Sequence, residues 1–265
     1  MAKRTTLREG QECGGLDLAR KSGPRQLKRE KAPGFWPIRR KSTTWVARTK
    51  PGSHPRNNSL PLVVVIREIL GFARTAREAI HIINTGKVKV DGVVRKDHRF
   101  PVGLMDVLQI EGASNHFRIL PKQNAGLLPS SIPQKESEFK LCKITGKKII
   151  SGGRTQINLH DGRNLIVQAR EPRPKEAEEY TVGGTIQLAL RDQKIMGLIP
   201  FQKGALGLVV DGQNLGLLGR IESITPGTHA RQKTVRIETQ GGSFETPAAY
   251  VIPIGTDRPL VEAGK

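Results

Sequence analysis

The side chains that could carry chemistry in this 265-residue chain are mainly lysines and arginines. Lysine and arginine number 44 against 24 aspartates and glutamates, which gives a formal net charge of +20 at pH 7. So large a charge repels itself in a folded chain, and a polyanionic partner is the natural reason for it. The chemistry predicted for these side chains is the neutralisation of phosphates, with an affinity that falls as salt rises.

Residues 1–60 hold 15 of the basic residues and 4 acidic ones, a net charge of +11. The segment has five prolines between 24 and 55 and few periodic apolar residues, so it cannot bury enough surface to fold by itself. A basic arm that becomes ordered on a nucleic acid is predicted, with a solvated tail as the alternative. Trp36 and Trp45 would be accommodated equally by packing on a neighbouring domain or by stacking on a base. The predicted nucleic-acid contacts here are Arg25, Lys28, Arg29, Trp36, Arg39, Arg40, Lys41, Trp45, Arg48, Lys50 and Arg56.

Residues 60–121 have the pattern of two helices followed by a small sheet. Apolar residues recur at helical spacing over 62–70. A second helix is predicted to begin at Thr75, which forms a capping box with Glu78, and to end at Gly86. An Asp-Gly pair then predicts a tight β-hairpin turn. The predicted strands lie within 88–95, 105–112 and 115–120.

Three arginines of this unit, Arg67, Arg74 and Arg77, are candidates for binding phosphate. Arg74 and Arg77 flank the N-terminus of the second helix, where free N–H groups also favour an anion. The alternative for each is a solvated surface charge.

Beyond residue 121 the helical signals stop, and short alternating stretches separated by glycine-containing turns predict β-strands. Their even spacing favours an all-β barrel or sandwich. The glycines spread through 204–224 suit a small, strongly bent five-stranded barrel. The predicted strands lie within 139–145, 155–162, 164–169, 185–190, 204–224, 233–239 and 242–254.

Several classes of protein are excluded by the same sequence. The longest clean apolar run, 62–66, is far shorter than the ~20 residues of a membrane span. The basic N-terminus has no apolar stretch behind it, so no secretory signal is expected. Cys13 and Cys142 form neither a disulfide framework nor a zinc site, which favours a reducing, intracellular compartment. No metal or cofactor site is predicted, and His160 beside Asp161 is interpreted as part of an Asp-Gly turn with a basic tip, not as a catalytic pair.

The segment RTAREAIHIINTGKVKVDGVVR (74–95) resembles the S-four-type RNA-binding domain, and 204–224 resembles a KOW motif. Between them lie KLCKI (140–144) and HDGRN (160–164). That order resembles the S-four-e family of small-subunit ribosomal proteins of archaea and eukaryotes over roughly residues 24–256. The further matching segments are GPRQLKREKAPGFWP (23–37), KPGSHPRNNSLPL (50–62), PVGLMDV (101–107) and YVIPIG (250–255).

The resemblance implies an α+β, mostly β fold in which a basic extended N-terminal arm precedes an S-four-type α/β RNA-binding domain. A central all-β domain and a C-terminal KOW-type, SH3-like β-barrel follow. The implied bounds are 1–59 for the arm, 60–121, 122–200 and 201–256 for the three domains, and 257–265 for a tail. The sequence PVGLMDV at 101–107 favours an archaeal source, while residues 1–22 depart from the family's pattern.

The resemblance also implies a function without covalent chemistry: binding and bridging small-subunit ribosomal RNA (16S-type) beside neighbouring ribosomal proteins. No membrane, small-molecule substrate or cofactor is expected, and the implied location is the small subunit of cytoplasmic ribosomes. The RNA-facing surface would run from the second helix along the hairpin. That surface adds Lys87, Lys89, Arg95 and Lys96 to the predicted contacts.

Three rival functions share some of these sequence features. An RNA-modifying enzyme such as a pseudouridine synthase would need a large catalytic domain with a nucleophilic aspartate, which 121–265 does not provide. A KOW-bearing transcription elongation factor would lack both the basic start and the S-four-type unit. A free-standing RNA chaperone with the same domains stays open, and it would bind many RNAs weakly.

Overall fold

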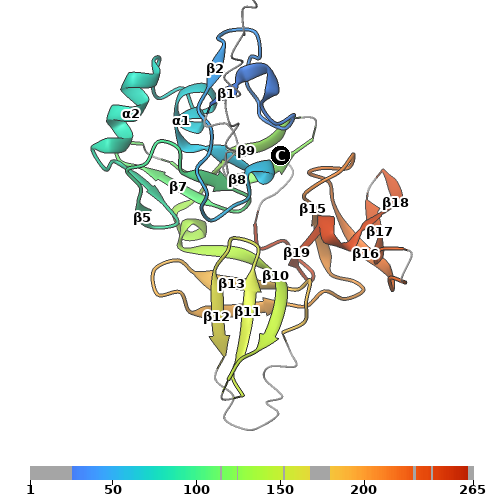
Figure 1. Ribbon diagram of the computed structural model, residues 1–265. Coiled ribbons are helices and arrows are strands. Elements are labelled where there is room, and N and C mark those ends of the chain that lie inside the picture. The colour runs from blue at the N-terminus through green and yellow to red at the C-terminus, as the bar shows by residue number, and fades with distance from the viewer. Residues whose placement is uncertain are drawn as a thin grey trace, which may run out of the picture.

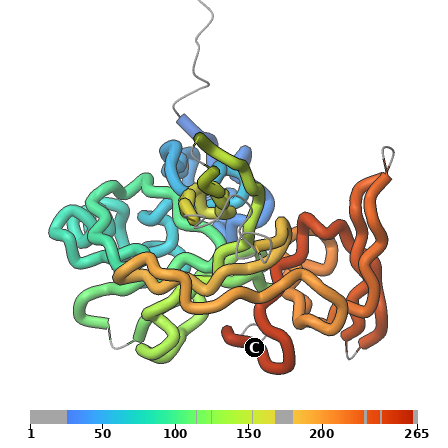
Figure 2. Tube along the Cα trace, turned by 90° about the horizontal axis from the view of Figure 1, so that it is seen from below, coloured from blue at the N-terminus to red at the C-terminus, as the bar shows by residue number. Residues whose placement is uncertain are grey.

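The computed structural model describes residues 26–113, 115–123, 125–151, 153–167, 180–228, 231–239 and 241–261. Arg25, Cys13 and the predicted extension 1–22 lie outside these residues. The described chain is mostly β with few helices, as predicted, and forms three lobes (Figure 1). Seen from below, the first and third lobes lie on opposite sides of the view (Figure 2).

The first lobe joins the N-terminal segment to the predicted helix-and-sheet unit. A two-stranded ribbon of β1 (Leu27–Lys28) and β2 (Trp45–Val46) packs beside α1 (Leu62–Val64), which continues as a π-helical turn over Val65–Ile69. Two 3-10 turns, Arg29–Lys31 and Arg56–Asn58, lie within the N-terminal segment. A second short pair joins β3 (Ser59–Pro61) to β6 (Pro101–Gly103).

The helix α2 (Ala76–Asn84) has the predicted boundaries and their predicted causes. The Thr75 side chain accepts from the backbone N–H of Glu78, and the Glu78 carboxylate accepts from the backbone N–H of Thr75. Gly86 follows the helix with φ of 81°, a left-handed conformation that favours glycine. Ala79 and Ile83 are fully buried on the inner face.

The sheet of this lobe has five antiparallel strands in the order β5-β4-β7-β8-β9. The predicted hairpin is confirmed, because Asp91 and Gly92 turn with φ of 51° and 77°. The predicted boundary after residue 121 is wrong, since it falls inside β8, and β9 extends the sheet beyond it. The strands are β4 (Val88–Val90), β5 (Val93–Val94), β7 (Val107–Ile110), β8 (His116–Lys122) and β9 (Gly126–Ile132).

The central lobe is an antiparallel sheet in the order β12-β11-β10-β13-β14. Four of these strands were predicted, and β14 was not. A 3-10 turn over Gln134–Glu138 leads into the sheet. The strands are β10 (Phe139–Ile149), β11 (Thr155–Leu159), β12 (Asn164–Val167), β13 (Thr185–Ala189) and β14 (Ile195–Ile199).

The third lobe is a five-stranded antiparallel sheet in the order β18-β17-β16-β15-β19. Gly216, with φ of 81°, lets the β15–β16 turn pack against the β8–β9 turn, since an added Cβ would lie 2.9 Å from Gln123 N. A 3-10 turn over Ala248–Tyr250 precedes the last strand. The strands are β15 (Leu206–Val209), β16 (Leu218–Thr225), β17 (Thr234–Thr239), β18 (Gly242–Pro247) and β19 (Val251–Gly255).

The extended arm predicted for residues 1–59 is wrong for its described part. Leu27, Trp36 and Val46 are buried in the same core as α1 and α2. The Trp36 indole N–H donates to the Ser59 carbonyl at 3.1 Å. Irregular, proline-rich backbone needs no core of its own when it can bury its few apolar side chains against a neighbouring one.

Candidate nucleic-acid interface

Seventeen of the eighteen predicted contact residues lie in the described chain, and they fall into three groups by exposure. Arg29 and Trp36 are buried. Arg40, Arg48, Arg67 and Arg95 are half-buried. The exposed members are Lys28, Arg39, Lys41, Trp45, Lys50, Arg56, Arg74, Arg77, Lys87, Lys89 and Lys96.

The prediction that Arg29 binds nucleic acid is corrected by its burial. Its side chain is 3% exposed, and its guanidinium forms an ion pair with Glu68 in the π-helical turn. Burial alone would raise the pKa of Glu68, but hydrogen bonds from Arg29 and Arg67 lower it. Arg29 also donates to the Arg39 carbonyl at 2.5 Å. It therefore holds the loop between β1 and β2 onto the helical face. Trp36 likewise has no free ring face to stack on a base.

Arg40 is also engaged by the protein itself. Its guanidinium donates to the carbonyl oxygens of Glu30, Ala32 and Pro33 at 3.0 to 3.1 Å. A guanidinium in this position ties Arg40 back to the 3-10 turn at the start of the loop between β1 and β2. Together with Arg29 it fixes the loop that leads into Trp45.

The N-terminal segment exposes a lysine and an aromatic ring side by side, Lys28 and Trp45. These residues oppose each other across β1 and β2, while Leu27 and Val46 oppose each other on the buried face. Lys50 is already paired with Asp97 at 2.6 Å. Burial raises the pKa of Asp97, but the hydrogen bonds from Lys50 and from the backbone N–H of Arg99, together with the Lys50 charge, lower it.

Arg74 and Arg77 are exposed at the first turn of α2, as predicted. The free N–H groups expected beside them are partly occupied, because Glu78 accepts from the backbone N–H groups of Arg74 and Thr75. These hydrogen bonds lower the pKa of Glu78. The helix terminus therefore already has an anion beside the two guanidinium groups, which lie exposed next to it.

The hairpin after α2 presents three exposed lysines on one side of the first lobe. Lys89 alternates with the buried Val88 and Val90, so its side chain points away from the core. The Lys96 side chain passes close to Gly86, since a Cβ added to Gly86 would lie 3.8 Å from Lys96 Cε. Lys87 directly follows Gly86 in the chain. The described residues form no ion pair with Lys87, Lys89 or Lys96.

Two predicted contacts in the same lobe have protein partners. Arg95 lies over the Phe100 ring, 4.5 Å from its centroid. Arg67 forms an ion pair with Glu68. Each keeps part of its guanidinium exposed, but neither is as free as the lysines of the hairpin.

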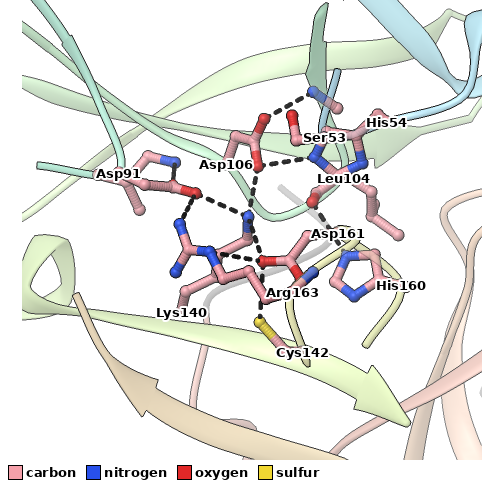
Figure 3. Close-up of polar contacts among 12 residues, drawn as sticks. Ser53, His54, Asp91, Leu104, Asp106, Lys140, Cys142, His160, Asp161 and Arg163 are labelled. Atoms are coloured by element: carbon pink, nitrogen blue, oxygen red, sulfur yellow. Dashed lines mark hydrogen bonds and ion pairs between the residues drawn. The ribbon is translucent and has the colours of Figure 1, made fainter. Parts of the chain in front are cut away.

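A buried ionic cluster that was not among the predicted sites lies where the first and central lobes meet (Figure 3). Lys140 of β10 is fully buried, and its ammonium group lies 2.8 Å from Asp91 and 3.3 Å from Asp161. The ammonium also lies 2.5 Å from Asp106, which in turn pairs with His54 Nε2 at 2.9 Å. The cluster thus ties β10 to the hairpin turn, to the loop before β7 and to the N-terminal segment.

The turn HDGRN contributes the other side of this cluster. Gly162 has φ of 76°, as an Asp-Gly turn requires, but Arg163 is not a free basic tip. Its guanidinium pairs with Asp91 at 2.8 Å and with Asp161 at 3.3 Å. His160 Nδ1 accepts the backbone N–H of Lys143, and burial lowers the pKa of His160 to about 4. A neutral, buried imidazole in a backbone hydrogen bond fits a structural role.

The pKa values in the cluster follow from burial opposed by charge. Burial would raise the pKa of Asp106, but the Lys140 ammonium lowers it well below its usual range. Burial and the neighbouring Asp106 together raise the pKa of Asp91. The pKa of Lys140, which burial alone would lower, is raised by Asp106 and Asp91. Buried charges with this many partners act as a fixed joint between the sheets.

The only residues that could have signalled the cluster in the sequence were charged residues inside apolar strand patterns. Lys140 within the stretch FKLCKIT was such a signal. Its acidic partners come from turns 34 and 49 residues away, so no local pattern identifies them. Within the described residues, no group of His, Cys, Asp and Glu is placed to hold a metal ion. None of the described helices is long and apolar enough to cross a membrane.

Comparisons with known families match most of the chain. Residues 60–108 match the S4 domain, 21–57 match the RS4NT (NUC023) domain, and 113–195 match ribosomal family S4e. The first match coincides with the unit predicted as S-four-type. The second match covers most of the N-terminal segment.

Among curated relatives, the small ribosomal subunit protein eS4 of Ignicoccus hospitalis is 43% identical, over 91% of this chain and 95% of the relative. That of Methanosphaera stadtmanae is 42% identical, over 92% and 98%. A crystal structure of the 30S ribosomal protein S4e from Thermoplasma acidophilum matches with a TM-score of 0.63 and 28% identity. That match covers 76% of this chain and 96% of the other.

Proposed function

Because the chain belongs to ribosomal family S4e, we propose that it is a structural protein of the small ribosomal subunit that binds ribosomal RNA and takes part in translation. It is not an enzyme, as its sequence predicted. Both relatives named above are archaeal, in keeping with the predicted source.

The observation that carries the proposal is the set of free cations on the first lobe. Arg74, Arg77 and the three hairpin lysines are exposed, and no acidic side chain of the described residues pairs with them. Lysine and arginine that face solvent without partners suit the phosphates of an RNA helix, whose deep major groove admits few side chains. Such contacts position the RNA and depend on its shape more than its sequence.

The same proposal includes the remaining candidate residues, the third lobe, the type of RNA and the location of the ribosome. Lys28, Arg39, Lys41, Trp45 and Arg56 would extend the RNA-binding surface onto the N-terminal segment. The five strands β15 to β19 suit the KOW-type barrel, with a surface for RNA or for a neighbouring ribosomal protein. The RNA would be of the 16S type, and the ribosome a cytoplasmic one.

The proposal is tested by binding the full chain to a small-subunit rRNA transcript across a series of salt concentrations. The slope of log K against log salt is negative, and each lost phosphate contact lowers the magnitude of this slope by about 1. The triple variant K87Q/K89Q/K96Q should lower this magnitude by about 2 to 3. A matched triple variant, R191Q/K194Q/K203Q, removes the same charge from exposed positions outside the first lobe and should lower it by less than 1.

Two results would contradict the proposal. Equal slopes for the two triple variants would show that the hairpin lysines make no special contact. Equally tight binding to unrelated RNAs, with the chain at the top of a sucrose gradient of cell lysate, would favour the RNA chaperone instead.

A further inference from the structure

The N-terminal segment exposes one of the chain's two tryptophans and buries the other. Trp45 is 52% exposed, whereas Trp36, nine positions earlier, is 3% exposed. Burying an indole is strongly favourable, and the core that takes Trp36 also takes Val46, the residue next to Trp45. Exposure of Trp45 therefore follows from the strand alternation, which sends its neighbour inward and Trp45 outward.

A cation lies beside this exposed ring. Lys28 is the cross-strand partner of Trp45, and cross-strand partners project from the same face. Lys28 is exposed, and no ion pair joins it to an acidic side chain of the described residues. Arg39 and Lys41, in the loop that leads into β2, are exposed as well.

The loop that presents Trp45 is held rigid by the two arginines that the protein uses itself. The backbone N–H of Arg29 donates to the Thr44 carbonyl at 2.9 Å, while its guanidinium donates to the Arg39 carbonyl. The Thr43 hydroxyl donates to the Trp45 carbonyl at 3.3 Å. In Figure 1 the ribbon lies at the same end of the molecule as α2, with α1 between them. An aromatic ring fixed in this way loses little entropy when a ligand stacks on it.

An exposed indole beside a lysine, on a backbone held by hydrogen bonds, suits an unpaired nucleotide. Every base has a flat face that can stack on an aromatic ring, and the neighbouring phosphate needs a cation. Within a double helix the faces of the bases are covered by their neighbours, so only loops, bulges and ends offer them.

We propose that Trp45 and Lys28 form a binding site for one unpaired nucleotide of RNA, with the base stacked on the indole and its phosphate on the ammonium group. This inference rests on the proposed function and adds to it a choice of unpaired over helical RNA. The hairpin lysines bind helix backbone, and the ribbon recognises a base that has left its helix.

The test compares two probes: a 20-base-pair RNA duplex with one bulged adenosine, and the same duplex without the bulge. In the full chain, Trp36 is buried, so quenching of tryptophan fluorescence reports on Trp45. The bulged probe should quench the fluorescence and the paired probe should not. W45A should bind the bulged probe about 10-fold more weakly and the paired probe less than 2-fold more weakly.

A matched control is I149A, which truncates a 75% exposed apolar residue at the far end of β10 and should leave both affinities unchanged. Thermal midpoints of W45A and I149A equal to that of the wild type verify that the fold is kept. An equal loss on both probes, or none on either, with the wild type still binding RNA, overturns the stacking site alone. Failure of the wild type to bind either probe overturns the proposed function together with this site.

Discussion

The Lys140 ammonium group and the Asp106 carboxylate form a fully buried ion pair, with Nζ 2.5 Å from Oδ1, that joins the central sheet to the first lobe. Lys140 also contacts Asp91 and Asp161, so one side chain balances much of the charge of three buried carboxylates. Electrostatics, and not apolar packing alone, therefore sets the relative position of the first and central lobes. RNA that contacts both lobes must find them in this one orientation.

Lys140→Met should destabilise the protein by about 3 to 5 kcal/mol, because it leaves buried carboxylates without their main cation. The free energy of unfolding in urea measures this effect. Lys148→Met, an exposed change on the same strand, is the control and should stay within about 0.5 kcal/mol of the wild type. A small loss in Lys140→Met would mean that Arg163 alone neutralises the cluster.

Acid should unfold the protein through the same carboxylates. The Lys140 ammonium lowers the folded pKa of Asp106 and Asp161 below the ordinary 3.8 despite their burial. A carboxyl with a lowered folded pKa stabilises the fold fully above its unfolded pKa and loses that contribution as pH falls. Thermal midpoints should therefore begin to fall below about pH 6, through the lowered pKa of His160, and fall further below about pH 4 through the two carboxylates.

The variant D106N should flatten that fall, while D91N should not, because the pKa of Asp91 is raised and its contribution has the opposite sign. Equal acid profiles for D106N and the wild type would assign acid unfolding to other groups.

Lys143 gives a pH effect on the alkaline side. Burial lowers its pKa to about 8 from 10.5, although its ammonium donates to the carbonyls of Ala248, Ala249 and Val251. Between these values the unfolded chain binds more protons than the folded one, so stability rises with pH. From pH 8 to pH 10 we expect a gain of at most about 3 kcal/mol.

The slope of unfolding free energy against pH measures the Lys143 effect. K143M should lose that slope, whatever its absolute stability, because methionine has no proton to release. K148M, which removes an exposed lysine of the same strand, should keep it.

Local patterns predicted the parts of the fold that local chemistry determines. The capping box of Thr75 and Glu78 and the Asp91-Gly92 turn lie where the sequence placed them, because each depends on residues within a few positions. The N-terminal segment was misjudged because its stability comes from contacts with α1 and α2, far along the chain. The same limit hid β9, whose Pro129 and serines have little strand character and which pairs with β8.

The candidate RNA contacts divide in the same way, into residues whose exposure a local pattern predicts and residues whose burial depends on distant partners. Exposure of Lys87 and Lys89 followed from alternation with buried valines, and Trp45 could have been placed in the same way once β2 was known. Composition could not separate Arg29 from Arg39, because the difference is made by Glu68, 39 residues from Arg29.

Arg29 and Arg39 should therefore respond in opposite ways to loss of charge. Arg29→Met removes a buried partner of Glu68 and should lower stability by about 3 kcal/mol, measured by urea unfolding. Arg39→Gln leaves the backbone carbonyl that Arg29 uses in place, so stability should change by less than about 0.5 kcal/mol. If Arg39 binds a phosphate, Arg39→Gln should lower the magnitude of the salt slope of RNA binding by about 1.

The control is Glu68→Gln, which removes the other member of the ion pair and should lower stability while keeping the salt slope. A folded, fully stable Arg29→Met with a reduced salt slope would return Arg29 to the RNA surface and refute its role in fixing the ribbon.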